Sequence, residues 1–274
     1  MCGVFKLSRS GYYSWIHRYP SGRVRETRLL KQEIESIYKK SGKAYGSPKI
    51  ALELNNKGWK VSRPRVARIM QKHGWKSRIC KKFRCSTTDS NHNLPVFENI
   101  LNRNFKAEKI SQKWVSDITY IPTGQGWLYL TTVLDLYDRK VIGWAMSTTM
   151  TTEETVIPAY KMAVKNRRLE KGLIFHSDRG VQYASKIFTH KLKQDNVIQS
   201  MSRKGNCWDN AVAESFFKIL KSEMVNHVRF ESLLQAKTAL FEFIEIWYNR
   251  KRIHSALGYK TPQEFGTINY LKCA

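Results

Sequence analysis

WVSDITYI, residues 114–121, is a run of β-branched and aromatic residues interrupted by one acid, Asp117. Such a run is typical of a buried strand, where burying a carboxylate costs free energy unless the group is paired or binds a ligand. Two comparable runs follow at 127–134 and 141–146, and turn residues separate the three. The sequence therefore predicts three strands joined by short turns, which is an antiparallel meander.

Helices and strands alternate after this meander. Thr152 is expected to cap a helix that runs to about Arg168, although Pro158 is an unusual residue so close to the start of a helix. The later elements are predicted as strand 173–177, helix 185–196, strand 197–201 and a helix that carries Glu214. The order β-β-β-α-β-α-β-α predicts an α/β domain of the ribonuclease H-like kind: a mixed five-stranded sheet with flanking helices.

The amino-terminal part predicts a small all-α domain. A helical pattern runs from Glu26 to Lys40, and two short helices follow it. Ser47 and Ser62 are their cap candidates, which outlines a helix-turn-helix. The second short helix carries cationic side chains that we expect to contact DNA, although a helical bundle with a solvated basic surface is the alternative; they are Arg63, Arg65, Arg68 and Lys72.

Changes in composition along the chain predict its domain boundaries. We expect a basic helical DNA-binding domain over 1–85 and a polar linker over 86–108. The catalytic core is expected over 109–222. A helical segment over 223–274, with a long helix from about Ser232, is expected to pack on that core.

The charge of the chain indicates its partner. There are 48 Lys and Arg residues against 22 Asp and Glu, a formal net charge of +26 in 274 residues, so a nucleic acid is the expected partner. No run of about 18 uncharged apolar residues and no signal-peptide core is present, which favours a cytoplasmic, nucleoid-associated protein rather than a membrane protein. The five cysteines are scattered, and thiols are favoured over a zinc site for Cys80 and Cys85.

Three acids form the candidate catalytic constellation. Asp117 lies on the first strand, Asp178 follows the fourth, and Glu214 lies on a helix, with 35 residues between it and Asp178. Crowded carboxylates repel one another, and two divalent cations would remove that cost. Oxygen-only ligands suit Mg²⁺, with Mn²⁺ as a substitute, so we expect two ions per site when DNA is bound.

Each acid also has a purely structural interpretation. Asp117 could be a strand-end acid on a solvated face, and Asp178 could form a turn with Gly180. Glu214 could belong to an exposed stripe of salt bridges with Lys218 and Lys221.

Further polar residues surround these acids in the sequence. We expect six to contact DNA: Arg179, Lys204, Lys218, Lys221, Arg250 and Arg252. Asn210 could order the metal ligands or a phosphate, with helix capping as the alternative. His176 could support the metal ligands, with a hydrogen-bonded core histidine as the alternative. Turn formation is expected for Asp135 and Asp138, and capping for Asp209.

These motifs together resemble the DDE transposases of insertion-sequence family three, a retroviral-integrase-like group. The resemblance covers nearly the whole chain and is specific through the motifs jointly. It is carried by 8–13, 45–50, 114–121, 176–180 with 182–183, 202–217, and 248–250 with 252, 254–258 and 261–262.

The resemblance implies that Asp117, Asp178 and Glu214 are the catalytic triad. It also implies cleavage of the element's own 3′ ends and their joining by transesterification through a circular intermediate. The chain looks like the second reading frame alone, so an upstream-frame protein is a possible partner, and homo-oligomers are expected because two ends are joined. The chain shows no His-His-Cys-Cys zinc module of the integrase type.

The leading hypothesis is thus a Mg²⁺-dependent DNA transposase. The alternative is a DNA-binding protein whose catalytic domain is inactive without the upstream-frame product. A hydrolytic nuclease of the ribonuclease H type is the third, and the basic helical lead argues against it.

Overall fold

The computed structural model describes residues 2, 4–5, 8–78 and 95–273, in two compact units, Met1–Arg78 and Ile79–Ala274. Cys80, Cys85 and the first part of the expected linker lie outside the described residues. Residues 95–104 pack on the second unit, where the backbone N–H groups of Ile100 and Leu101 donate to the Ser200 hydroxyl. No helix among the described residues is long and apolar enough to span a membrane.

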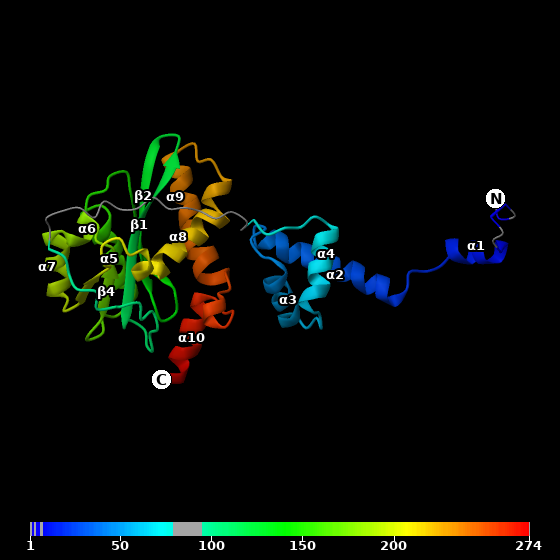
Figure 1. The fold of residues 1–274 in the computed structure, drawn as a ribbon, viewed down its shortest axis with the longest axis horizontal. Coiled ribbons are helices and arrows are strands. Elements are labelled where there is room, and N and C mark those ends of the chain that lie inside the picture. Colours follow the sequence, from blue (N-terminus) through cyan, green and yellow to red (C-terminus); the bar gives the residue numbers. More distant parts are fainter. Residues whose placement is uncertain (1, 3, 6–7, 79–94, 274) are drawn as a thin grey trace. The chain divides into compact units, whose positions relative to one another are not determined.

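The described residues of the first unit form four helices, α1 (Arg9–Ile16), α2 (Gly22–Lys40), α3 (Ser47–Asn56) and α4 (Arg63–Lys72) (Figure 1). The last three share an apolar core built from Leu30, Ile34, Ile50, Leu54, Val66 and Met70. Helices α3 and α4, joined by a short turn, form the expected helix-turn-helix outline.

The helix starts in this unit differ in detail from the prediction. Helix α2 begins four residues early because the Ser21 hydroxyl accepts from the N–H of Val24. Gly46, not Ser47, is the N-cap of α3, and Pro48 occupies its first turn, where an N–H group is not needed. Ser62 precedes α4 as expected, but its side chain makes no capping hydrogen bond to the described residues.

The second unit is built on a five-stranded sheet in the order β3-β2-β1-β4-β5. Its strands are β1 (Lys113–Thr123), β2 (Gly126–Asp135), β3 (Val141–Ser147), β4 (Ile174–Ser177) and β5 (Ile198–Met201). The first three pair antiparallel, whereas β4 is parallel to β1 and β5 is parallel to β4. The expected mixed five-stranded sheet is therefore confirmed.

Helices cover both faces of this sheet (Figure 1). One face carries α5 (Val156–Asn166), α6 (Val181–Ala184) and α7 (Lys186–Gln194) over a core that includes Trp114, Phe175 and Phe188. The other face carries α8 (Ala211–Glu223) and α9 (Leu233–Phe241). Short helical turns, η1 (Cys207–Asn210), η2 (Val225–His227) and η4 (Ser255–Leu257), and the terminal helix α10 (Pro262–Cys273) complete the unit.

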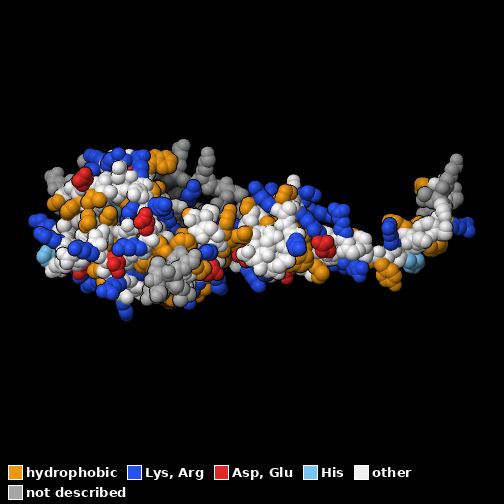
Figure 2. All heavy atoms as spheres, turned by 90° about the horizontal axis from the view of Figure 1, so that it is seen from below, with side chains coloured by type: hydrophobic (Ala, Val, Ile, Leu, Met, Phe, Trp, Pro, Cys, Tyr) orange, Lys and Arg blue, Asp and Glu red, His pale blue; other side chains and the backbone are white. Residues whose placement is uncertain are grey.

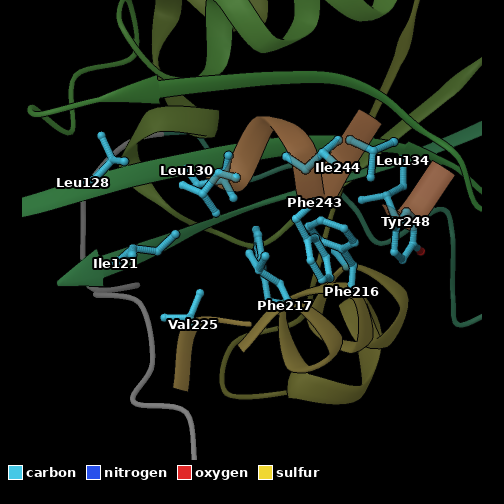
Figure 3. Close-up of a cluster of buried hydrophobic side chains, with 14 of the residues drawn as sticks. Ile121, Leu128, Leu130, Leu134, Phe216, Phe217, Val225, Phe243, Ile244 and Tyr248 are labelled. Carbon is cyan, nitrogen blue, oxygen red and sulfur yellow. The ribbon is translucent and has the colours of Figure 1, made fainter. Parts of the chain in front are cut away.

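The carboxyl-terminal segment belongs to the core of the second face. Figure 3 shows Phe243, Ile244 and Tyr248 lying among Leu134 of β2 and Phe216 of α8. Such interleaving of apolar side chains is the main stabilising contribution in a folded domain. This segment is therefore an integral part of the sheet domain.

Helix α5 begins at Val156, whereas the sequence predicted a start near Thr152. Pro158 explains the difference, because proline is tolerated only in the first turn of a helix and would break one that started earlier. Glu154, two residues before the helix, accepts hydrogen bonds from the hydroxyls of Ser147 and Thr149.

The predicted long helix from Ser232 is two structures in series. Helix α9 continues into a π-helix, η3 (Glu242–Lys251). In this wider helix Asn249 faces inward, where its side chain accepts from the N–H of Val141 and donates to the carbonyl of Val141, each at 3.0 Å. Sequence periodicity does not distinguish a π-helix from an α-helix over so short a span.

Candidate active site

Two neighbouring parallel strands bring Asp117 and Asp178 to the same level of the sheet. The pairing of β1 with β4 sets Val115 opposite His176. Asp117 lies two residues beyond Val115 on β1, and Asp178 is the first residue after β4, two residues beyond His176. The two acids therefore lie at corresponding positions of adjacent chain segments, at the carboxyl end of β4.

Backbone groups orient both carboxylates. Asp117 Oδ1 accepts from the N–H of Ile118 at 2.8 Å. Asp178 Oδ1 accepts from the N–H of Gly180 at 3.0 Å, which closes the sharp turn expected after β4. Both acids are partly exposed and so are accessible from solvent.

Glu214 lies in the first turn of α8, where the helix dipole favours a negative charge. The helix is tied to β1 at its start, because Asn210 Nδ2 donates to the carbonyl of Ser116 at 3.0 Å. Ser116 directly precedes Asp117, so this bond fixes the helix beside the acid. The Glu214 side chain is exposed and has room to change rotamer.

The three acids interact electrostatically. Burial raises the pKa of Asp117 well above its ordinary value, and the charges of Asp178 and Glu214 raise it further. The N–H of Ile118 and the Lys221 ammonium oppose this rise. The pKa of Glu214 is also raised, first by lost hydration of its carboxyl group and then by Asp178. Mutual repulsion of this kind requires that the groups be near one another.

The acids do not form a closed ligand set in this conformation. Within the described residues, no three His, Cys, Asp or Glu side chains stand together in a way that could hold a metal ion. The acids can shift one another's pKa values without forming such a group, because the long, exposed Glu214 side chain can lie near the two aspartates without pointing at them. The donor set still consists of carboxylate oxygens alone, which suits Mg²⁺ or Mn²⁺ and not a thiolate- or imidazole-preferring metal.

A buried tyrosine behind the acids was not foreseen from the sequence. The Tyr183 hydroxyl lies 2.7 Å from the Ser116 hydroxyl. Burial and the charges of Asp117 and Asp178 raise the pKa of Tyr183. Its only signal in the sequence was its place five residues after Asp178, in a motif shared with the family that the chain resembles.

Lys221 does not lie on an exposed cationic face, which corrects the sequence prediction. It is only 5% exposed, and its Nζ lies 5.1 Å from the centroid of the Tyr120 ring. Its charge lowers the pKa of Asp117, so the ammonium group lies near the acids. Helix α8 packs closely on β1 and carries this position inward, whereas Lys218 remains exposed as expected.

Arg252 does not lie on the surface either, which corrects the position that the sequence predicted for its side chain. Its side chain is 8% exposed and pairs with Glu223, with Nη2 2.8 Å from Oε1. The Trp247 indole N–H donates to the other carboxylate oxygen of Glu223 at 2.9 Å. The Arg252 guanidinium is therefore engaged in an ion pair with the Glu223 carboxylate, because a buried charge needs a partner of opposite charge.

The remaining predicted DNA contacts differ in accessibility. Arg65 of α4 is partly exposed and pairs with Glu26 at 2.9 Å. Arg179 is partly buried, and its Nε donates to the carbonyl of Ser202 at 2.6 Å. The exposed cations among those predicted are Arg63, Arg68, Lys72, Lys204, Lys218 and Arg250. On the face seen in Figure 2, Lys and Arg side chains clearly outnumber the acidic ones.

His176 and Asn210 lie behind the acids. His176 is fully buried between the hydroxyls of Ser200 and Ser202, at 2.9 and 3.2 Å. Burial lowers its pKa to about 4, so the ring is neutral near pH 7. Asn210 makes no capping bond within the described residues, and its buried Oδ1 finds no hydrogen-bond partner there.

Three further acids have structural roles. Asp209 was expected to cap α8, but it is fully buried and pairs with Arg103 and Arg203. These two cations hold its pKa well below the usual range. Asp135 and Asp138 accept from the backbone N–H groups two residues further on, as turn formation predicts.

Family models and insertion-sequence relatives match most of the chain. Models described as integrase core domains match residues 107–207 and 195–262, and a model described as an HTH-like domain matches residues 25–83. The chain is 43% identical to a 31 kDa protein of insertion element IS600 from Shigella sonnei, over 97% of each chain. It is 38% identical to the transposase InsF of insertion sequence IS3A from Escherichia coli K12, over 98% of this chain and 93% of that one. A simian T-cell lymphotropic virus intasome structure shares 14% identity and a TM-score of 0.49, over 85% of this chain and 74% of that one.

Proposed function

The chain belongs to the IS3 family of insertion-sequence transposases, and from that premise we propose that Asp117, Asp178 and Glu214 are its catalytic residues. The supporting observation is the placement of the three acids: Asp117 on β1 and Asp178 just after β4 lie on neighbouring parallel segments, and the bond from Asn210 to the Ser116 carbonyl holds the start of α8, which carries Glu214, beside Asp117. A fold that holds like charges together against their repulsion at a solvent-accessible place is typical of a functional site.

The same acids would hold two divalent cations, Mg²⁺ or Mn²⁺, when DNA is bound. Such ions lower the pKa of the attacking hydroxyl and stabilise the leaving oxygen. The N–H groups of Ile118 and Gly180 hold the two aspartates in fixed orientations. Asn210 fixes the start of α8 on β1, so Glu214 approaches from a defined position.

The proposed reaction has two successive displacements at phosphorus. In the first, a water oxygen attacks the phosphorus that follows the element's 3′ end, and the bond to the 3′ oxygen breaks. In the second, the freed 3′-hydroxyl attacks a phosphorus of another strand, and one phosphodiester bond replaces another. In each step the nucleophile loses a proton and the leaving oxygen gains one.

DNA contact by the exposed cations completes the proposal. Helix α4 would follow the backbone of the terminal repeats through Arg63, Arg68 and Lys72, while Arg65 shares its charge with Glu26. Near the acids, Lys218, Lys204 and Arg179 would neutralise phosphates, and Arg250 would do so on η3. Two chains or more would assemble to join two ends, with the upstream-frame protein as a possible partner in the bacterial cytoplasm.

A second candidate function has one observation in its favour. The acids do not stand as a metal-holding group within the described residues. A DNA-binding protein whose catalytic domain awaits the upstream-frame product would have this property. Adding that product to the chain and measuring cleavage distinguishes the two, since the second candidate predicts activity only in its presence.

The decisive experiment measures 3′-end cleavage and strand joining on DNA that carries the element's terminal repeats, with Mg²⁺. We expect Asp178→Asn and Glu214→Gln to abolish both reactions without loss of DNA binding. Glu242→Gln is the matched control, because Glu242 is an exposed acid on η3 outside the acid cluster. Undiminished cleavage by Asp178→Asn would refute the assignment.

A further inference from the structure

Helix α1 presents aromatic side chains to solvent. Its hydrogen-bonded start is capped by the Ser8 hydroxyl, which accepts from the N–H of Gly11. None of its described residues is buried. Tyr13 is 59% exposed, Trp15 is 72% exposed, and Tyr19 just beyond the helix is 92% exposed. This segment lies outside the HTH-like match, which begins at residue 25.

A helix in this state needs a partner. Eight residues are too few for a stable isolated helix in water, and Gly11 within it lowers its propensity further. Clustered exposed aromatics are uncommon on a solvated surface and mark an interaction site. Tyr12 and Tyr13 already meet edge to face, at 5.5 Å between centroids, so the rings form one patch.

The charge of the segment indicates the chemistry of that partner. No Asp or Glu precedes Glu26 in the sequence. Exposed cations lie on both sides of the aromatic patch, Arg9 before it and Arg18, Arg23 and Arg25 after it. A second copy of the segment would bring the same uncompensated charge, so self-association through it is disfavoured. A polyanion meets both the cations and, if it carries flat apolar surfaces, the rings.

We propose that residues 8–25 bind DNA whose bases are unpaired, with the rings of Tyr13 and Trp15 stacking on bases and the arginines following the backbone. Bases in a duplex are covered on both faces by their neighbours, whereas unpaired bases offer a face to an aromatic side chain. Helix α4 then contacts duplex DNA, whereas residues 8–25 contact unpaired bases. The inference rests on the proposed function, because strand cleavage and transfer supply such unpaired ends.

The test uses the full chain in buffer without divalent ions, so that no reaction occurs. Its probes are a fluorescein-labelled oligothymidylate of about 30 nucleotides and a mixed-sequence duplex of equal length, followed by anisotropy. The double variant Tyr13→Ala with Trp15→Ala removes both rings and keeps the charge. Tyr13→Phe with Trp15→Phe keeps aromatic rings at both positions, and Leu234→Ala removes an equally exposed apolar side chain from α9.

We expect the alanine double variant to lose about tenfold or more in affinity for the single strand and less than about twofold for the duplex. The slope of log affinity against log salt should stay the same, because no cation is removed. The phenylalanine variant and Leu234→Ala should bind as the unchanged chain does. An unaltered melting temperature verifies that the variants fold.

Equal affinity of the alanine double variant and the unchanged chain for the single strand would overturn the inference. So would an equal loss on both probes, or a loss of self-association in sedimentation with unchanged DNA affinity. Should the chain cut and join DNA while the ring variant binds normally, this inference fails and the proposed function stands. Should ring-dependent binding occur without cleavage or joining, the proposed function fails and the binding site stands.

Discussion

Replacing Arg252 by alanine should destabilise the fold and leave DNA affinity almost unchanged. Its guanidinium makes three contacts with Glu223: Nη2 to Oε1 at 2.8 Å, and Nε to Oε1 and Oε2 at 3.0 and 3.1 Å. The two side chains are 8% and 2% exposed. Removal of the cation therefore leaves a buried carboxylate that, within the described residues, keeps a hydrogen bond from the Trp247 indole N–H alone. The loss of one partner from a buried pair costs about 3–5 kcal/mol.

For a domain of this size each kcal/mol moves the melting temperature by about 2–4 °C, so Arg252→Ala should melt roughly 6–20 °C lower. Thermal unfolding followed by circular dichroism measures this. Arg250→Ala is the matched control, because an exposed side chain two residues earlier, on η3, should shift stability by less than about 0.5 kcal/mol.

A double variant separates charge from packing in the same experiment. Glu223→Gln with Arg252→Met removes both charges and keeps an acceptor for the Trp247 indole, so it should recover most of the lost stability. An Arg252→Ala protein that melts with the unchanged chain but binds DNA weakly would refute the buried-pair reasoning. It would restore Arg252 as a DNA contact.

Three further outcomes follow from the structure. Asp117→Asn should stabilise the metal-free protein at neutral pH, because an acid with a raised folded-state pKa favours folding only while it is protonated. The gain in the free energy of unfolding should be about 1.4 kcal/mol for each unit by which the pKa is raised. Melting curves should show this gain vanish as the pH falls towards 3.8. Arg68→Gln on exposed α4 should reduce the slope of log affinity against log salt for duplex DNA by about 0.9, and an unchanged slope in a titration would exclude a phosphate contact. Gly143→Ala should destabilise the fold by roughly 1–3 kcal/mol in denaturant unfolding. A Cβ at this position of β3 would lie 2.2 Å from the Ala159 carbonyl oxygen and 2.7 Å from the Ala163 nitrogen of α5. A variant as stable as the unchanged chain would contradict that close packing.

Strand order and the elements that carry the acids could be predicted because they depend on local signals. The β-branched run around Asp117 and the short turns after it specify the meander, and right-handed crossovers then place β4 beside β1. The shared level of Asp117 and Asp178 follows from that topology. These signals need no knowledge of side-chain packing.

The fate of individual cations could not be predicted, because it depends on contacts between elements distant in sequence. Lys221 has the helical spacing of an exposed residue relative to Glu214, yet α8 turns it toward Tyr120 of β1. Arg252 follows two other cations and so looks like part of a basic surface, but the π-helical turn before it delivers it to Glu223. Whether a cation finds a buried acid is decided by tertiary geometry alone.

The repulsion among the acids links the stability of this fold to its proposed chemistry. Burial raises the pKa of Asp117 most. Asp178, held near it by strand pairing, and Glu214, held near it through the bond from Asn210 to Ser116, raise that pKa further. The free energy that disfavours the charged, metal-free state is the same free energy that a bound cation would recover. Ligands that bind only the folded state stabilise it. Variants that relieve the repulsion should therefore gain stability and lose cation affinity together, whereas variants in the distant Arg252–Glu223 pair should lose stability with no direct effect on cation affinity.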